Sequence, residues 1–201
     1  MKKTLLALTA AALIAMPAYA ATTQTVTVST NIGTTLDLSM TIFKLDAAGN
    51  PVGSNLGTSI PFGALVADTT FSVFHGADAY TVYLTANTSS LPYTIKATMA
   101  ALSNGATTLP NAMVMATVSA KSAGADIAGD SVSGVTNDSA IMSNKTIYTS
   151  NASGTGALLQ LVYGISGGQA VGVPFVGWQP ILLDQASGTY NGSVTYTLAT
   201  T

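Results

Sequence analysis

The sequence contains no cysteine, no arginine and no glutamate, and its single histidine is His75. Without cysteine the chain can form neither a disulfide nor a zinc site of the usual Cys/His type. Arginine and glutamate commonly cover helix surfaces, so their absence argues against a helical protein. The chain also lacks the basic clusters that bind nucleic acid or an anionic membrane surface. These absences point to fold and function classes that need few charged side chains.

Long apolar runs are scarce as well. The run Thr4–Met16 is too short to span a bilayer, and no later run reaches the length of about 18 apolar residues that a membrane helix needs. It follows two lysines and precedes Ala18 and Ala20, which stand at the positions that signal peptidase reads. We therefore expect residues 1–20 to be a signal peptide, cleaved before Ala21, and the protein to be exported.

The polar residues that are present are those of strands and turns. Without the two lysines of the leader, four lysines stand against eight aspartates, a net charge of −4. The remaining polar positions are mostly Thr, Ser and Asn, and the apolar ones include many Val, Ile and Tyr residues. This composition predicts an all-β protein, and the exported chain is long enough for one domain with a sizeable core.

Short alternating segments separated by turn signals predict a β-sandwich of about seven to nine strands. The segment Leu158–Ile165 is the most continuously apolar of them, which predicts a central strand. By contrast, residues 121–157 are rich in Ser, Gly, Asp and Asn, and we interpret them as extended loops with one short edge hairpin at most. The expected strands are Leu36–Ile42, Phe71–Phe74, Tyr80–Ala86, Tyr93–Met99, Met113–Val118, Leu158–Ile165, Val173–Leu183 and Tyr190–Leu198.

The sequence offers little for catalysis. A Ser-His-Asp arrangement would depend on His75 with a nearby carboxylate such as Asp78, and no serine stands in an elbow motif. Glycoside hydrolysis would have to draw two carboxylates from eight scattered aspartates, with no glutamate available as the acid. We therefore expect no enzymatic activity and no cofactor.

Three further patterns have plain explanations. Asp126, Asp130 and Asp138 could offer oxygen ligands to calcium, but their spacing matches no calcium loop and aspartates are common turn formers, so we expect no metal site. Trp178 and the tyrosines could line a sugar-binding face, but core and edge packing is the commoner role of such residues and the interpretation we favour. Asn-x-Ser/Thr tripeptides predict only loops or exposed faces, at Asn87, Asn144, Asn151 and Asn191.

The segment after the leader alternates like a strand but has no hairpin partner immediately after it. In Thr25–Ile32, one face carries Val26, Val28 and Ile32 together with the smaller Thr30, while hydroxyl groups occupy the other face. A strand in this position can be supplied to the sheet of another molecule.

These residues resemble a known family. Val26–Ile32, followed by Leu36–Leu38, is similar to the mature start of the alpha-type (class 5, colonisation-factor-antigen-like) chaperone–usher major pilins. The segment Ala186–Tyr196 resembles the closing strand of that family, which has a small-Gly-x-Tyr-x-Gly entry. The lack of cysteine also fits this class. Gly33 and Thr34 stand where the family tends to place an Asp-Pro turn, and Gly33 can still supply the bend.

The resemblance implies an immunoglobulin-like β-sandwich over residues 34–201 with an incomplete sheet, which a donated N-terminal strand, residues 21–33, completes. The inserted side chains would be Val26, Val28, Thr30 and Ile32, with Gly33 as the hinge. The groove wall, which would also be the strand that pairs with the chaperone, would comprise Tyr190, Val194, Tyr196 and Leu198.

The implied function is that of a major subunit of a fimbria at the cell surface, which polymerises by donor-strand exchange and supports adhesion. The implied partners are identical pilin subunits, a periplasmic chaperone, an outer-membrane usher and an adhesin at the filament tip. The sequence leaves an alternative open, a secreted self-complemented β-sandwich that binds carbohydrate. A pilin of another class ranks lower because such pilins usually carry cysteines, and an enzyme ranks third.

Overall fold

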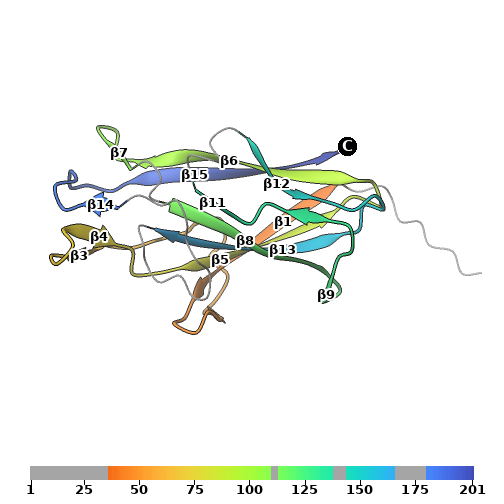
Figure 1. The fold of residues 1–201 in the computed structure, drawn as a ribbon, viewed down its shortest axis with the longest axis horizontal. Helices are drawn as coiled ribbons and strands as arrows, with labels where there is room; N and C mark the ends of the chain where they lie inside the picture. Colours follow the sequence, from red (N-terminus) through yellow and green to blue (C-terminus); the bar gives the residue numbers. More distant parts are fainter. Residues whose placement is uncertain (1–35, 110–112, 138–143, 166–179) are drawn as a thin grey trace, which may run out of the picture. The chain divides into compact units, whose positions relative to one another are not determined.

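The fold is known from a computed structural model (Figure 1). It describes residues 36–109, 113–137, 144–165 and 180–201, and for residues 113–118 and 135–137 the backbone alone. Throughout this part of the chain strands alternate with turns and no helix occurs, which confirms the all-β prediction. None of the described segments is a helix long and apolar enough to cross a membrane.

Most strands belong to two antiparallel sheets that form the layers of a sandwich (Figure 1). This arrangement is consistent with the expected immunoglobulin-like fold. Across the larger sheet the order is β11 (Val135–Asn137), β8 (Met113–Ser122), β13 (Ala157–Ile165), β5 (Tyr80–Asn87), β1 (Asp37–Leu45) and β2 (Pro51–Val52), with β9 (Ala125–Asp126) paired to β8. Across the second sheet it is β10 (Ser131–Val132), β12 (Lys145–Thr149), β6 (Tyr93–Ser103) and β15 (Asn191–Thr200), with β7 (Thr108–Leu109) paired to β6.

The core lies between these two sheets. Along β13 the side chains of Leu159, Leu161 and Tyr163 are fully buried, and the strand lies between β8 and β5. The prediction of a central strand here is therefore confirmed. From the facing sheet, Ile95 and Ala97 of β6 enter the same cluster. Alternation with a period of two explains this, because every second side chain of each strand points inward.

Residues 121–157 contain more structure than their composition predicts. Four short strands, β9 to β12, fall within this region. The most important is β12, which pairs with β6 and buries both Ile147 and Tyr148. The prediction of extended loops was wrong because two adjacent apolar residues suffice to anchor a strand when a neighbouring sheet edge supplies the hydrogen bonds.

A third, small sheet comprises β14 (Ile181–Leu182), β4 (Val73–His75) and β3 (Val66–Asp68). Phe71, which was expected within a strand, lies in the turn between β3 and β4. The link from β4 to β5 is held at Gly76, whose N–H donates to Ile165 O at 3.3 Å. A Cβ atom at this position would lie 2.2 Å from Ile165 Cγ2, so only glycine fits against the end of β13.

The strand registers define two ends of the sandwich. Asp37 pairs with Asn87 at the start of β1, and the short link from β5 to β6 brings Tyr93 and its partner Thr200 to the same end. We call this the Leu36 end. At the opposite end β1 finishes at Leu45, and the N–H of this residue donates to Ala79 O just after β4. Consequently β1 and β15 run in opposite directions, and the small sheet belongs to the end opposite Leu36.

Candidate functional site

A groove of about 990 Å³ lies between β1 and β15, which belong to different sheets. Met40 and Ile42 line it from β1, and Val194 and Tyr196 line it from β15. The floor includes Val82 of β5, which is fully buried. Residues 58–65 and the segment before β15 also line the groove, whose walls are about equally polar and apolar.

Both strands that border the groove have an open edge. β15 pairs with β6 from Asn191 to Thr200, and no other described strand pairs with it. β1 pairs with β5 on one side, and its second edge meets β2 only at Lys44 and Leu45. Unpaired N–H and C=O groups on a strand edge are a template for another strand.

The loop after β2 closes part of the second edge of β1. The N–H of Ile42 donates to Asn55 Oδ1 at 3.0 Å, and Ile42 O accepts from the N–H of Leu56 at 2.9 Å. Among the described residues, the edge of β1 from Asp37 to Thr41 carries no such partner. The open part of β1 therefore lies toward the Leu36 end.

Half-buried apolar side chains follow β1 and β15, and two of them, Met40 and Val194, line the groove. Leu38 and Met40 of β1 and Val194 and Leu198 of β15 pack against the core without being fully covered. A strand laid between β1 and β15 would cover them, and complete burial of such a side chain contributes about 1.5–3 kcal/mol. The groove therefore presents apolar surface and hydrogen-bonding edges to the same extended occupant.

A pair of tyrosines joins the two sheets beside the groove. Tyr163 of β13 is fully buried, and its hydroxyl is hydrogen-bonded to the hydroxyl of Tyr196. Burial raises the pKa of Tyr163 well above its usual value of 10.0 and also raises the pKa of Tyr196. Both phenols are therefore neutral at physiological pH, and the groove presents no charge there.

Polar contacts hold the groove wall at the end opposite Leu36. The Tyr190 hydroxyl donates to Ala186 O at 2.7 Å and accepts from Gln185 Nε2 at 2.9 Å. It also lies 2.8 Å from Thr107 Oγ1, beside the β6–β7 turn. Tyr190 thus ties the segment before β15 to the second sheet.

The expected wall residues can now be placed. Tyr190, Val194 and Tyr196 line the groove, and Leu198 packs against the core from the same strand. The sequence reasoning missed Met40 and Ile42 of β1, which also line the groove. Their alternation with polar neighbours was visible in the sequence, but nothing in it showed that the face they share would border β15.

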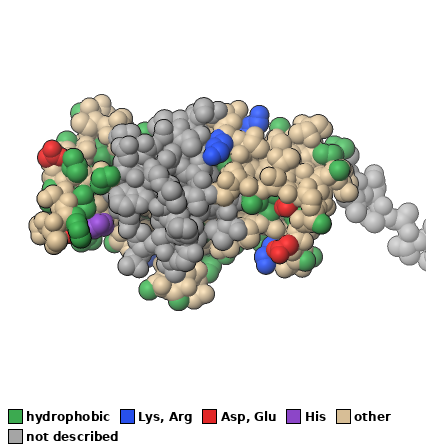
Figure 2. Space-filling view, in the orientation of Figure 1, with side chains coloured by type: hydrophobic (Ala, Val, Ile, Leu, Met, Phe, Trp, Pro, Cys, Tyr) green, Lys and Arg blue, Asp and Glu red, His purple; other side chains and the backbone are tan. Residues whose placement is uncertain are grey.

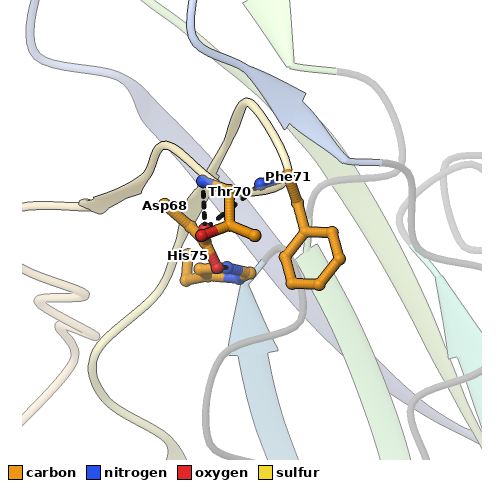
Figure 3. Close-up of polar contacts among 4 residues, drawn as sticks. All are labelled: Asp68, Thr70, Phe71 and His75. Carbon is orange, nitrogen blue, oxygen red and sulfur yellow. Dashed lines mark hydrogen bonds and ion pairs between the residues drawn. The ribbon is translucent and has the colours of Figure 1, made fainter.

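His75 does not pair with the expected carboxylate (Figure 3). Its Nε2 atom lies 3.1 Å from Asp68 Oδ2, whereas Asp78 forms an ion pair with Lys44 at 2.7 Å. Asp68 also accepts the backbone N–H groups of Thr70 and Phe71, at 2.8 and 3.2 Å. The hydrogen bond from His75 is the main reason why the pKa of Asp68 lies below its usual value.

These contacts fix the turn between β3 and β4. Asp68 satisfies backbone donors of the turn on one side and the imidazole on the other, which is a common arrangement at a tight turn. No serine hydroxyl is hydrogen-bonded to His75 among the described contacts. The pair therefore lacks the nucleophile that the Ser-His-Asp hypothesis requires.

The other sites considered from the sequence are not assembled in the described part of the chain. Asp126 is exposed and lies 3.9 Å from Lys121, and Asp138 lies outside the described residues. Within the described ranges, no three His or Asp side chains gather as a metal site would need. Asn87, Asn144 and Asn191 are exposed, as expected.

Asn151 differs from those three asparagines because it is half-buried. Its Nδ2 donates to Thr155 Oγ1 at 2.9 Å. Its Oδ1 accepts the N–H of Thr155 at 3.1 Å, so this side chain stabilises a turn.

Several expected residues lie outside the described part of the chain. These are the cleavage residues Ala18, Ala20 and Ala21, the strand residues Val26, Val28, Thr30 and Ile32, the hinge Gly33, and Trp178. The structure thus describes the groove, whereas the segment expected to act as the donor strand lies outside the described residues.

Comparison of the chain with protein-family models, with curated proteins and with solved structures finds no match.

Proposed function

We propose that this chain is the major structural subunit of a chaperone–usher fimbria and that it polymerises by donor-strand exchange. One observation carries the proposal: the groove between β1 and β15 is bordered by two strand edges that are open among the described residues. Addition of a strand to a sheet edge is a general mode of protein recognition, in which the backbone supplies affinity and alternate side chains supply specificity.

The leading segment of the chain has the length and pattern that this groove needs. Residues 22–32 span roughly 36 Å when extended, at about 3.3 Å per residue. The strand β15 along which they would lie has 10 residues. Val26, Val28 and Ile32 would cover the half-buried side chains of the groove, with Thr30 as the smaller fourth side chain.

The groove would be filled in two successive stages. A periplasmic chaperone would first cover it by pairing with β15, and the leading strand of the next subunit would replace the chaperone at an outer-membrane usher. The chaperone stage explains how a subunit with an open apolar groove can avoid aggregation before assembly. An adhesin at the tip would complete the filament, which would support adhesion to surfaces or host cells.

The alternative is that the leading segment fills the groove of its own molecule. The direction of the inserted strand distinguishes this case from insertion into a neighbouring copy. Residues 33–35 link Ile32 to Leu36, so a strand folded back within the same molecule would form a hairpin with β1. Such a strand would run antiparallel to β1 and therefore parallel to β15. A strand from a neighbouring copy has no such restriction.

The test uses substitutions on the two faces of β15. Val194 lines the groove, whereas the next residue, Thr195, is exposed. In the exported chain, Val194→Lys should abolish the SDS-resistant multiples expected of a pilin, because a lysine in the groove would be buried without a partner. The matched control Thr195→Lys should retain them.

The donor side is tested in the same way. Val28→Arg should leave the subunit able to bind its chaperone but unable to join a neighbour, while Thr27→Arg, on the opposite face of the strand, should still polymerise. Binding of a synthetic peptide of residues 22–32 to the exported chain would be measured in parallel. Concentration-independent monomers that bind no peptide would instead favour the self-complemented carbohydrate-binding alternative.

A further inference from the structure

The small sheet has one face that no described element covers, and this face carries apolar side chains beside the pair of Asp68 and His75. In β4, Phe74 packs against the core, so its neighbours Val73 and His75 point to the opposite face. The registers place Val66 of β3 opposite His75 and Leu182 of β14 opposite Val73. Cross-strand partners share a face of a sheet, so these side chains lie together on the outer face.

This outer face and the adjoining turn expose large apolar groups. Phe71 is 73% exposed, Val66 56% and Leu182 51%. Figure 2 shows hydrophobic side chains gathered near the histidine at the end of the molecule where β3 and β4 lie in Figure 1. We call Val66, Phe71, Val73 and Leu182 the end patch.

The turn that carries Phe71 is held in place before any partner arrives. Asp68 accepts the N–H groups of Thr70 and Phe71 and contacts His75, while the phenylalanine ring lies apart from this pair (Figure 3). Leu183 donates its N–H to Ser72 O at 3.2 Å, which ties the turn to β14. A turn fixed in this way loses little conformational entropy when it binds.

The opposite end of the sandwich also exposes leucines. Leu36 is 58% exposed and Leu91, in the turn after β5, is 49% exposed. Leu36, to which the leading segment is covalently joined, lies at this end, because β1 begins at Asp37. Both ends of one copy therefore expose large apolar side chains. The leading segment joins the copy at the Leu36 end.

The direction of an incoming strand decides which ends of two copies meet. A strand parallel to β15 would bring the neighbouring copy to the Leu36 end, from which the acceptor's own leading segment leaves. A strand antiparallel to β15 brings the neighbour to the end opposite Leu36, which is also the end that carries the end patch, and leaves each end of a copy with one neighbour. The second arrangement can repeat without crowding.

The link between strand and body is short. Residues 33–35 separate Ile32 from Leu36, and such a link spans at most about 14 Å when extended. The Leu36 end of the neighbour is therefore held close to the end patch, at an effective concentration on the order of millimolar. Even a patch too small to form a stable dimer alone can bind under these conditions.

We propose that the end patch is a second contact between successive copies of this chain, and that it receives the exposed leucines Leu36 and Leu91 of the neighbouring copy. The inference rests on the proposed donor-strand assembly and adds to it a contact between the folded bodies. We take the occupant to be another copy of this chain because the short link of residues 33–35 would bring the exposed leucines of that copy to the end of the acceptor that carries the end patch.

The absence of cysteine allows a direct test by cross-linking. In filaments of the full chain, Phe71→Cys combined with Leu91→Cys should give a ladder of covalent multiples with a short bis-maleimide. Phe71→Cys combined with Val52→Cys is the matched control, because Val52 pairs with Lys44 near the same end as Phe71. This control should give no ladder.

A second measurement separates the end contact from the strand contact. Phe71→Ser with Leu182→Ser should make filaments shed subunits at least about tenfold faster, since burial of one phenylalanine corresponds to a tenfold factor or more. Affinity for the peptide of residues 22–32 should stay within about twofold, because the groove is untouched. Val132→Ser, at an exposed position of β10, is the control for loss of an apolar surface group.

The outcomes are distinguishable. Normal peptide binding with no cross-linked ladder and no faster shedding would overturn the end contact and leave donor-strand assembly standing. A chain that binds no peptide and forms no multiples would overturn both proposals.

Discussion

At the scale of single residues, the buried tyrosines make the stability of the fold depend on pH in the alkaline range. Burial raises the pKa of Tyr163, Tyr196 and Tyr93 above the usual value of 10.0. In the unfolded chain these phenols lose their protons near pH 10, whereas in the folded protein they retain them to higher pH. Above pH 10 the unfolded state therefore binds fewer protons than the folded state.

The free energy of unfolding should accordingly fall as pH rises from about 9 through 10 and above. Urea denaturation at a series of pH values, followed by circular dichroism, measures this. Tyr163→Phe should weaken the dependence because it removes one buried phenol, and Tyr83→Phe, at a half-buried position, serves as the control. An unchanged urea midpoint between pH 8 and 11 would contradict the expectation.

At the scale of elements, the junction between the small sheet and the sandwich depends on Gly76. A methyl group there would clash with Ile165 and with its carbonyl oxygen, at 2.2 and 2.7 Å. Overpacking of this kind costs about 1–3 kcal/mol. Gly76→Ala should therefore lower the urea midpoint, while Ala77→Ser, at the exposed neighbouring position, should not.

Gly76→Ala also tests whether the end patch depends on the position of the small sheet. If the small sheet is displaced, Gly76→Ala filaments should also shed subunits faster, although Phe71 is intact. Peptide binding in the groove should change less, because the open edges of β1 and β15 do not include Gly76. Equal losses of subunit retention in filaments and of peptide affinity would indicate that the substitution destabilises the whole domain.

At the scale of the whole molecule, an open groove is the feature that separates a polymer subunit from a self-contained domain. The chain ends at Thr201, whose N–H donates to Pro92 O at 2.9 Å at the Leu36 end. A strand appended there through a short turn could fold back antiparallel to β15, in the direction proposed for a neighbour's strand.

Appending a second copy of residues 22–32 after Thr201 should therefore convert multimers into monomers and raise the melting temperature by roughly 10 °C, as several kcal/mol would in a domain of this size. Size-exclusion chromatography and thermal unfolding measure the two effects. The control carries arginine at the position of Val28 in the appended copy and should remain multimeric. Failure of the unmodified copy to abolish multimers would contradict the proposed strand direction.

The extent to which the fold follows from sequence differs between elements. Long alternating segments such as Tyr80–Ala86 and Leu158–Ile165 were predicted as strands because a period of two directly reflects the side-chain geometry of a strand. The strand β12 was missed because its anchor is only two residues, Ile147 and Tyr148, within a polar region. Phe71 was assigned to a strand because its apolar character does not distinguish a turn that is held by the Asp68 side chain.

The sequence by itself determined that the protein is all-β, that it has few titratable side chains, and that Val194, Tyr196 and Leu198 share one face of the last strand. Those properties follow from composition and from local periodicity. Only the tertiary structure decided that this face borders a groove shared with Met40 and Ile42, and that His75 meets Asp68 rather than Asp78. Such pairings join residues from different strands, and their proximity depends on how the sheets pack rather than on any local pattern.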